Sequence, residues 1–393
     1  MKKIMFVFAA VATVAACSKN SQSFDNQNLT PEENGAPVAV EFSSNVVAAV
    51  SAKSQGGVDA WDAAQNLHIY GYKRVSGGVD YSTTPFIDNV IAVSPAEGAA
   101  DNSLAVYRPG TSNMYYYDGN YTYDFFGFYM DDLAVVPSPK VDGVDVPVEI
   151  TGGEDLMLAK ADPETDYQKS LDSGIFTGDQ SSWNVRYAYS AYAARRGVHP
   201  SLTFKHQLVR FRFYITSGSD FETTGTPENL VAKGLTVTSK YKADLCVAGN
   251  ITGLRNISEE TAPLSLRSFD PETKKLVPLV PYEVPDKDLS VENEANLLGE
   301  SLMVFPGESS YGINLTLNQF GEDNNLALTL NISDVKTEGG AAVSQSVFTA
   351  GYSYKVYINV VGIETVELSA ELEDWKDGGR VDIDSDDAPE VIE

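Results

Sequence analysis

The segment 351-GYSYKVYINVVGIETVELSAELEDW-375 indicates the fold class of this chain. Apolar side chains fill every second position of 352–360 and again of 366–372. The positions between them hold Ser, Lys, Asn, Glu and one Tyr. A period of two places one face of a strand on a core and leaves the other face in water. The segment therefore predicts two half-buried antiparallel strands.

The same spacing recurs along the chain, because apolar residues return at every second position of 38–42, 67–69, 313–317 and 326–332. Gly, Asn, Asp and Pro separate these runs at short intervals, which is typical of sandwiches rather than of a parallel sheet. No long run has helical spacing. A chain of 393 residues has room for two domains. We therefore expect an all-β fold of two antiparallel β-sandwich domains in tandem, with few short helices.

The run 202–215 changes phase in the middle. Leu202, Phe204, His206 and Leu208 share one face, and Val209, Phe211, Phe213 and Ile215 continue with the opposite parity. A bulge near Leu208 would keep both sets buried. We place the first strand of the second domain here. The predicted division is a signal peptide at 1–16, a polar tether at 17–37, an N-terminal sandwich at 38–199, a C-terminal sandwich at 200–378 and an acidic tail at 379–393.

The N-terminus carries an export signal. A basic start, an apolar run over 4–14 and two small residues lead to Cys17, and the run is too short to span a bilayer as a mature helix. The arrangement resembles the lipobox of bacterial lipoproteins. In that family the peptide is cut between Ala16 and Cys17, the Cys17 thiol receives diacylglycerol, and the new amino group of Cys17 is acylated (palmitate being one such acyl group). Ser18 then favours the outer membrane by the same resemblance. The alternative is an ordinary secretory signal with an incidental cysteine.

Composition narrows the classes of function. The net charge of −27 argues against binding to nucleic acid or to anionic lipid. If Cys17 is acylated, Cys246 has no intramolecular partner, so we expect no disulfide and a buried, unreactive Cys246 within a strand.

Catalytic chemistry finds little support. The three histidines, His68, His199 and His206, have no second His or Cys at metal-ligand spacing. The glycine-rich and hydrolase motifs are absent. The sequence therefore predicts no enzyme, no cofactor, no catalytic residue and no metal site.

Two weaker signals remain open. The aromatic stretch 115–129 could stack on glycans through Tyr115, Tyr117, Tyr121 and Tyr123, or could be core and cross-strand pairs. Acidic residues between Asp382 and Glu393 partly follow a calcium-loop spacing, but the glycine of that pattern is missing and a solvated acidic tail is the simpler interpretation.

Several stretches resemble the fimbrillin family, the pilin-like lipoproteins of Bacteroides- and Porphyromonas-type bacteria. They are the lipobox and tether, 38–42, Trp61 with 67–72, 155–159, 202–209 and the closing 351–375. The acidic tail after Trp375 and the lack of any Arg before Arg74 depart from the family pattern.

The resemblance implies a pair of transthyretin-like sandwiches and a role as fimbrial (pilus) subunit or as accessory or tip adhesin. Such a subunit is anchored by lipid in the cell outer membrane, exposed at the surface, and found in the fimbrium after processing. A trypsin-like protease removes the first strand in this family, and a strand from the next subunit replaces it. The implied partners are other pilin subunits and a host or bacterial surface receptor.

Lys53 is the candidate maturation site, because it is the sole basic residue between Lys19 and Lys73 and lies in a Ser/Gln/Gly-rich stretch. Cleavage there would leave a chain that begins at Ser54. The alternatives are that Lys53 is a loop charge in an uncleaved anchor subunit, and that the protein is a monomeric surface lipoprotein that binds glycans.

Overall fold

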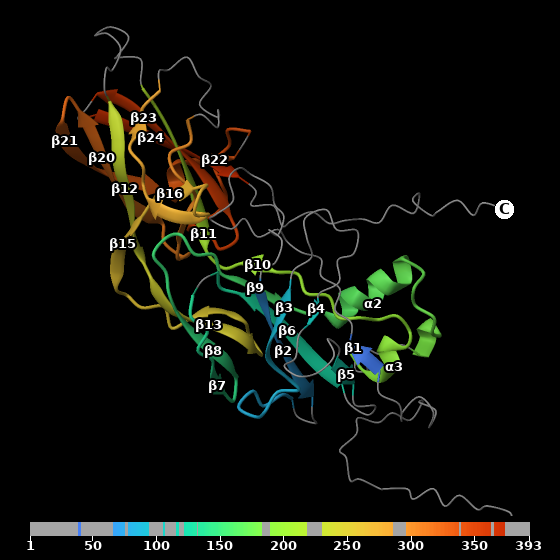
Figure 1. The fold of residues 1–393 in the computed structure, drawn as a ribbon. Helices are drawn as coiled ribbons and strands as arrows, with labels where there is room; N and C mark the ends of the chain where they lie inside the picture. Colours follow the sequence, from blue (N-terminus) through green and yellow to red (C-terminus); the bar gives the residue numbers. More distant parts are fainter. Residues whose placement is uncertain are drawn as a thin grey trace, which may run out of the picture.

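The computed structural model describes most of the chain between Val38 and Glu373. The described residues are 38–40, 66–74, 78–93, 105–106, 115–117, 122–131, 133–182, 189–217, 230–285, 296–337, 339–362 and 365–373. They are rich in strands, so the predicted all-β class is confirmed at this level (Figure 1). None of the helices in these ranges has the length and apolar character needed to cross a bilayer.

A six-stranded sheet forms the core of the N-terminal half. Its order is β10 (Lys205–His206), β9 (Met157–Lys160), β6 (Thr122–Tyr129), β2 (Asn66–Arg74), β3 (Ile87–Val93) and β4 (Ala105–Val106). β6 is buried on both faces. Phe126 and Phe128 point into the larger hydrophobic cluster, whereas Tyr123 and Phe125 belong to the smaller one. The alternation of side chains along a strand explains this division.

A four-stranded sheet packs on the side of the larger cluster, and its order is β14 (Gly253–Arg255), β13 (Lys242–Gly249), β8 (Gly143–Glu149) and β7 (Ser138–Lys140). Pro139 lies in β7, at the edge of the sheet, where a residue without an N–H is tolerated. The predicted domain boundary at 199/200 stays a prediction, and two pairings cross it: β10 with β9, and β13 with β8.

Two further sheets form the other end of the molecule (Figure 1). One has the order β19 (Leu302–Val304), β11 (Val209–Ser217), β23 (Ser353–Gly362), β24 (Thr365–Glu373) and β22 (Val335–Thr337). The other has the order β15 (Thr261–Ser265), β12 (Val231–Lys240), β20 (Ser310–Gln319) and β21 (Glu322–Asn331), with β18 (Tyr282–Glu283) paired to β12. Rings of Phe211, Tyr311, Phe348 and Tyr354 meet between them. A separate hairpin joins β16 (Arg267–Asp270) to β17 (Lys275–Pro278).

The expectation of purely antiparallel pairing is wrong at two places. β11 runs parallel to β23 over residues 210–217, and β22 runs parallel to β24. The antiparallel hairpin of β23 and β24 is present as expected. Alternation shows which face of a strand is buried but carries no information on the direction of its neighbour, so a parallel pair between distant segments cannot be recognised from it.

Helices are few and short among the described residues, as expected. α2 (Pro163–Asp172) begins at the N-cap Asp162, whose side chain accepts a hydrogen bond from the Glu164 N–H, and Pro163 occupies its first turn. α3 (Ala191–Ala194) is a single turn capped by Ser190. Short 3₁₀ turns complete the set, η1 (Gln180–Ser182) and η4 (Ile332–Asp334).

The phase change in 202–215 is a change of sheet and not a bulge in one strand. His206 ends β10 in the six-stranded sheet, and Val209 begins β11 in the five-stranded sheet. Both parity sets are buried, as the sequence predicted. Leu202 and Phe204 face the smaller cluster, whereas Leu208 and the whole second set face the larger one, because the chain passes from one sheet to the next within two residues.

Gly127 on β6 tests how tightly the smaller cluster packs on the sheet. A Cβ at this position would lie 2.8 Å from the Phe204 ring. We expect Gly127→Ala to lower the free energy of unfolding by about 1–3 kcal/mol through overpacking. Gly312→Ala on β20 is the control, because its Cβ would meet nothing closer than 3.9 Å. Equal melting temperatures for the two variants in calorimetry would contradict this packing.

Candidate assembly site

The first strand lies beside the six-stranded sheet rather than within it. β1 (Val38–Val40) pairs antiparallel with β5 (Tyr115–Tyr117), with Val38 opposite Tyr117 and Val40 opposite Tyr115. This register covers three residues of each strand. The ladder that holds β1 is therefore short.

Val40 inserts into the smaller hydrophobic cluster, and 5% of its surface is exposed. The cluster fills the space between the sheet, β1 and α3, and its other members include Leu67, Ile69, Phe125, Tyr189, Ala191, Leu202 and Phe204. Burial of one valine stabilises by about 1.5–3 kcal/mol. Removal of β1 would expose these apolar neighbours, which together with the paired edge of β5 we call the seat of β1.

The C-terminal hairpin is held very differently. β23 is a central strand, with β11 on one side and β24 on the other. Tyr354, Val356, Ile358 and Val360 are almost completely buried. Withdrawal of β23 would break two ladders and open the core of the C-terminal half, so β23 belongs to the permanent fold.

β24 is covered along part of its outer edge. β22 pairs with Ala370, Glu371 and Leu372, and in the described chain no strand pairs with the preceding part of that edge. Val366 and Leu368 face the larger cluster but remain partly exposed. Glu367 is exposed and accepts a hydrogen bond from Asn359. The apolar and acidic faces predicted for this strand are therefore present.

The aromatic stretch contributes to the core where its side chains are described. Tyr123 is 2% exposed, and its ring packs against Phe86 and Phe125. It offers no face to a sugar, so the core interpretation holds for this residue. Tyr115 and Tyr117 lie in β5, where the backbone pairing with β1 is described. Tyr121 lies outside the described residues.

The remaining predicted site residues also lie outside the described ranges. They are Ala16, Cys17, Lys53, Ser54 and the tail 379–393. Cys246 is buried in β13 as expected, and burial raises the pKa of its thiol, which disfavours the thiolate.

Two buried polar clusters escaped the sequence analysis. Asp155 and His206 form a pair with Oδ2 and Nδ1 2.8 Å apart. Asp166 of α2 accepts hydrogen bonds from the Tyr189 hydroxyl and the Ser201 N–H, and burial raises its pKa. Both clusters join segments distant in sequence, and their position inside the fold indicates a structural role.

The comparison with protein families settles the class of this chain. The profile of the fimbrillin-like family matches residues 52–375, most of the sequence. The chain belongs to the fimbrillin-like family. It is thus a fimbrial, structural protein of the cell surface and not an enzyme. No curated protein sequence matches this fimbrillin-like chain.

Solved structures similar to the fimbrillin-like chain are distant in sequence. A candidate cell adhesion protein from Bacteroides uniformis is 17% identical, with a TM-score of 0.49, and the match covers 87% of this chain and 98% of that one. Fimbrilin FimA from Porphyromonas gingivalis is 9% identical, with a TM-score of 0.40 and coverages of 87% and 98%. The tip fimbrial protein Mfa3 of the same species is 9% identical, with a TM-score of 0.37 and coverages of 86% and 100%.

The Asp155–His206 pair gives a test of the centre of this fimbrillin-like fold. His206→Ala leaves the buried Asp155 carboxyl group without this hydrogen-bond partner, so we expect the free energy of unfolding to fall by about 1–3 kcal/mol. Lys205→Ala, on the exposed face of the same strand, is the control and should keep the melting temperature of the parent. Thermal unfolding followed by circular dichroism measures both. An unchanged melting temperature for His206→Ala would show that the pair does not stabilise the fold.

Proposed function

We propose that this protein is a fimbrial subunit that assembles by exchange of its first strand for a strand of a neighbouring subunit. The observation that carries the proposal is the seat of β1. Three paired residues and the buried Val40 side chain hold this strand, outside the main sheets. A strand attached so lightly can leave without loss of the sheets that define the fold.

An incoming strand would restore what departure of β1 removes. Backbone hydrogen bonds to β5 would supply affinity, and one alternate side chain would refill the place of Val40. The donor and acceptor surfaces of such a contact differ, so each subunit can accept one neighbour and donate to the next. Repetition of a head-to-tail contact that does not close produces a filament.

The donor segment lies beyond β24 in this proposal. The two ladders of β23 and its buried side chains argue against β23 as the donor. The chain continues past Glu373 with Gly378-Gly379 and then Val381-Asp382-Ile383, a glycine hinge followed by a short alternation. A segment beyond a hinge can extend into a neighbour without strain in the donor fold.

Export and processing complete the proposal. Acylation of Cys17 would anchor the precursor in the outer membrane, where several acyl chains give durable attachment. Cleavage after Lys53 would then release residues 17–53, which include β1, and leave Ser54 as the first residue. The proposal includes the case in which this protein is a tip or accessory adhesin that binds a host or bacterial surface receptor.

Cleavage is tested at Lys53. We expect Lys53→Gln to block a trypsin-like protease, so that surface protein begins at acylated Cys17 and forms no polymer ladder in mild detergent. Lys53→Arg keeps a basic residue and should behave as the parent, with chains that begin at Ser54. Mass spectrometry of the N-terminal peptide and gel analysis of surface extracts measure both. Normal polymer made of Cys17-started chains would rule out strand removal as the trigger.

Variants of the tail 379–393 test whether this segment is the donor strand. We expect deletion of 379–393 to abolish the polymer and leave the melting temperature of the monomer unchanged. The double variant Val381→Asp, Ile383→Asp should act like the deletion, because the tail then lacks the two apolar side chains that would take the place of Val40 in the neighbouring subunit. Asp382→Asn with Asp384→Asn is the matched control and should polymerise. Fibres of normal length from the truncated chain would refute donation by this tail.

A further inference from the structure

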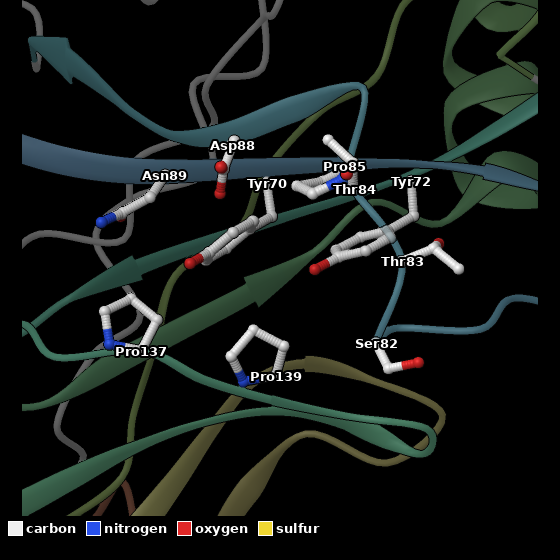
Figure 2. A pocket seen from close by; sticks show the side chains of 10 residues that line it. All are labelled: Tyr70, Tyr72, Ser82, Thr83, Thr84, Pro85, Asp88, Asn89, Pro137 and Pro139. Carbon is white, nitrogen blue, oxygen red and sulfur yellow. The ribbon is translucent and has the colours of Figure 1, made fainter.

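A pocket of about 540 Å³ lies on the opposite face of the six-stranded sheet from the seat of β1. Its floor is Tyr70 and Tyr72 of β2, which belong to the larger hydrophobic cluster, whereas Val40 packs in the smaller one. The turn 82–85 and β3 form one wall, and Pro137 and Pro139 form the other (Figure 2). This volume is within the range of small-molecule sites in proteins.

The two tyrosines present hydroxyl groups rather than ring faces to the pocket. Each residue is 2% exposed, and the rings pack on one another and on Phe128 and Tyr81. Figure 2 shows both hydroxyl oxygens directed toward the side of Pro137 and Pro139. Among the described residues no hydrogen bond joins either hydroxyl to another group of the protein. The two hydroxyl groups therefore face the pocket and are available to bond a ligand.

The environment keeps these hydroxyls neutral. Burial raises the pKa of Tyr70 and of Tyr72 far above the usual value, and the Asp88 carboxylate contributes in the same direction. Each hydroxyl can therefore donate one hydrogen bond and accept others. Asp88, exposed at the rim, adds a pure acceptor.

The walls are held in place by hydrogen bonds of their own. The Asp80 carboxylate accepts from the N–H and the hydroxyl of Ser82, and the Asp80 carbonyl accepts from the Thr83 hydroxyl. The Tyr81 N–H donates to the Val141 carbonyl and so ties this turn to the segment that carries the two prolines. The rim is thus formed before any ligand arrives, which lowers the entropic cost of binding.

Asn89 closes the end of the pocket on β3. Its Oδ1 lies 2.8 Å from His68 Nδ1, which orients the amide, and its backbone has a φ of 47°. Asn tolerates this left-handed conformation better than most residues. Burial lowers the pKa of His68, so the imidazole adds no positive charge beside the pocket near neutral pH.

The chemistry of the lining selects the ligand. Hydroxyl, amide and carboxylate groups line the pocket together with proline rings, and Lys and Arg are absent from the lining. Because the described lining residues include no Lys or Arg, an anionic ligand would meet the Asp88 carboxylate without a cation among them. A proline-rich peptide needs exposed aromatic faces, and here the rings are covered. A sugar supplies closely spaced hydroxyls for Tyr70, Tyr72 and Asp88 and apolar C–H faces for the prolines.

We propose that this pocket binds a neutral saccharide, with the Tyr70 and Tyr72 hydroxyls and the Asp88 carboxylate as its hydrogen-bonding groups. The site does not depend on strand exchange, because it lies on the other face of the sheet and uses none of the residues of the β1 seat. It gives the subunit an adhesive capacity of its own.

The test uses the full exported chain in detergent and an array of neutral oligosaccharides beside sialylated and sulfated ones, followed by titration calorimetry with the best neutral binder. We expect binding of neutral glycans, and a loss of at least about tenfold in affinity for Tyr70→Phe with Tyr72→Phe, which removes two hydrogen bonds and keeps both rings. Asp88→Asn should weaken binding as well. Tyr81→Phe is the matched control, a buried neighbour outside the lining, and should bind as the parent.

Four results would overturn the proposal. They are retention of acidic glycans alone, absence of any glycan binding, unchanged affinity in the Tyr70/Tyr72 double variant, and capture of a proline-rich peptide at the pocket in place of sugar. Melting temperatures of all variants are measured in parallel, and a loss of binding counts only for variants that melt as the parent does. Failure here leaves polymer formation untouched, so it is distinguishable from failure of strand exchange.

Discussion

The passage from His206 to Val209 joins the two ends of this molecule, and the rest of the architecture depends on it. Before the passage the chain pairs with β9, and the Gln207 N–H donates to the Leu156 carbonyl. After it, the Leu208 carbonyl accepts from the Gly351 N–H, and β11 runs beside β23. The buried Asp155–His206 pair adds a side-chain contact at the start of this passage. Backbone hydrogen bonds therefore hold this passage to both halves of the molecule.

The strands of this protein are attached to the fold by ladders of very different length. β23 shares ladders with two neighbours and buries most of its apolar face. β1 shares three residues with one neighbour and buries Val40. Local opening is governed by such differences in ladder length and burial. A subunit that must remain intact while one strand leaves needs this contrast.

The proposed assembly site and the proposed saccharide site lie on opposite faces of the six-stranded sheet. Because side chains alternate along β2, Leu67 and Ile69 face the seat of β1, while Tyr70 and Tyr72 face the pocket. Assembly and ligand binding can therefore coexist on one sheet without competing for residues. Gly71 and Gly127 let the rings of Phe125 and Phe204 approach the sheet closely on the assembly side.

The sequence by itself predicted several of the strands and their buried faces, including the hairpin 353–373 and the buried Cys246, because a period of two reports the faces of a strand directly. Which strands from distant parts of the chain are neighbours was visible only in the tertiary structure. At the phase change near Leu208, the apolar side chains on both sides are buried whether the chain forms a bulge or moves to another sheet, so the pattern cannot distinguish the two. The parallel pairing of β11 with β23 leaves no local pattern in the sequence. The pocket joins Tyr70, Asp88 and Pro137 from three separate segments. Contacts of this kind arise from the packing of distant segments, and local periodicity carries no record of them.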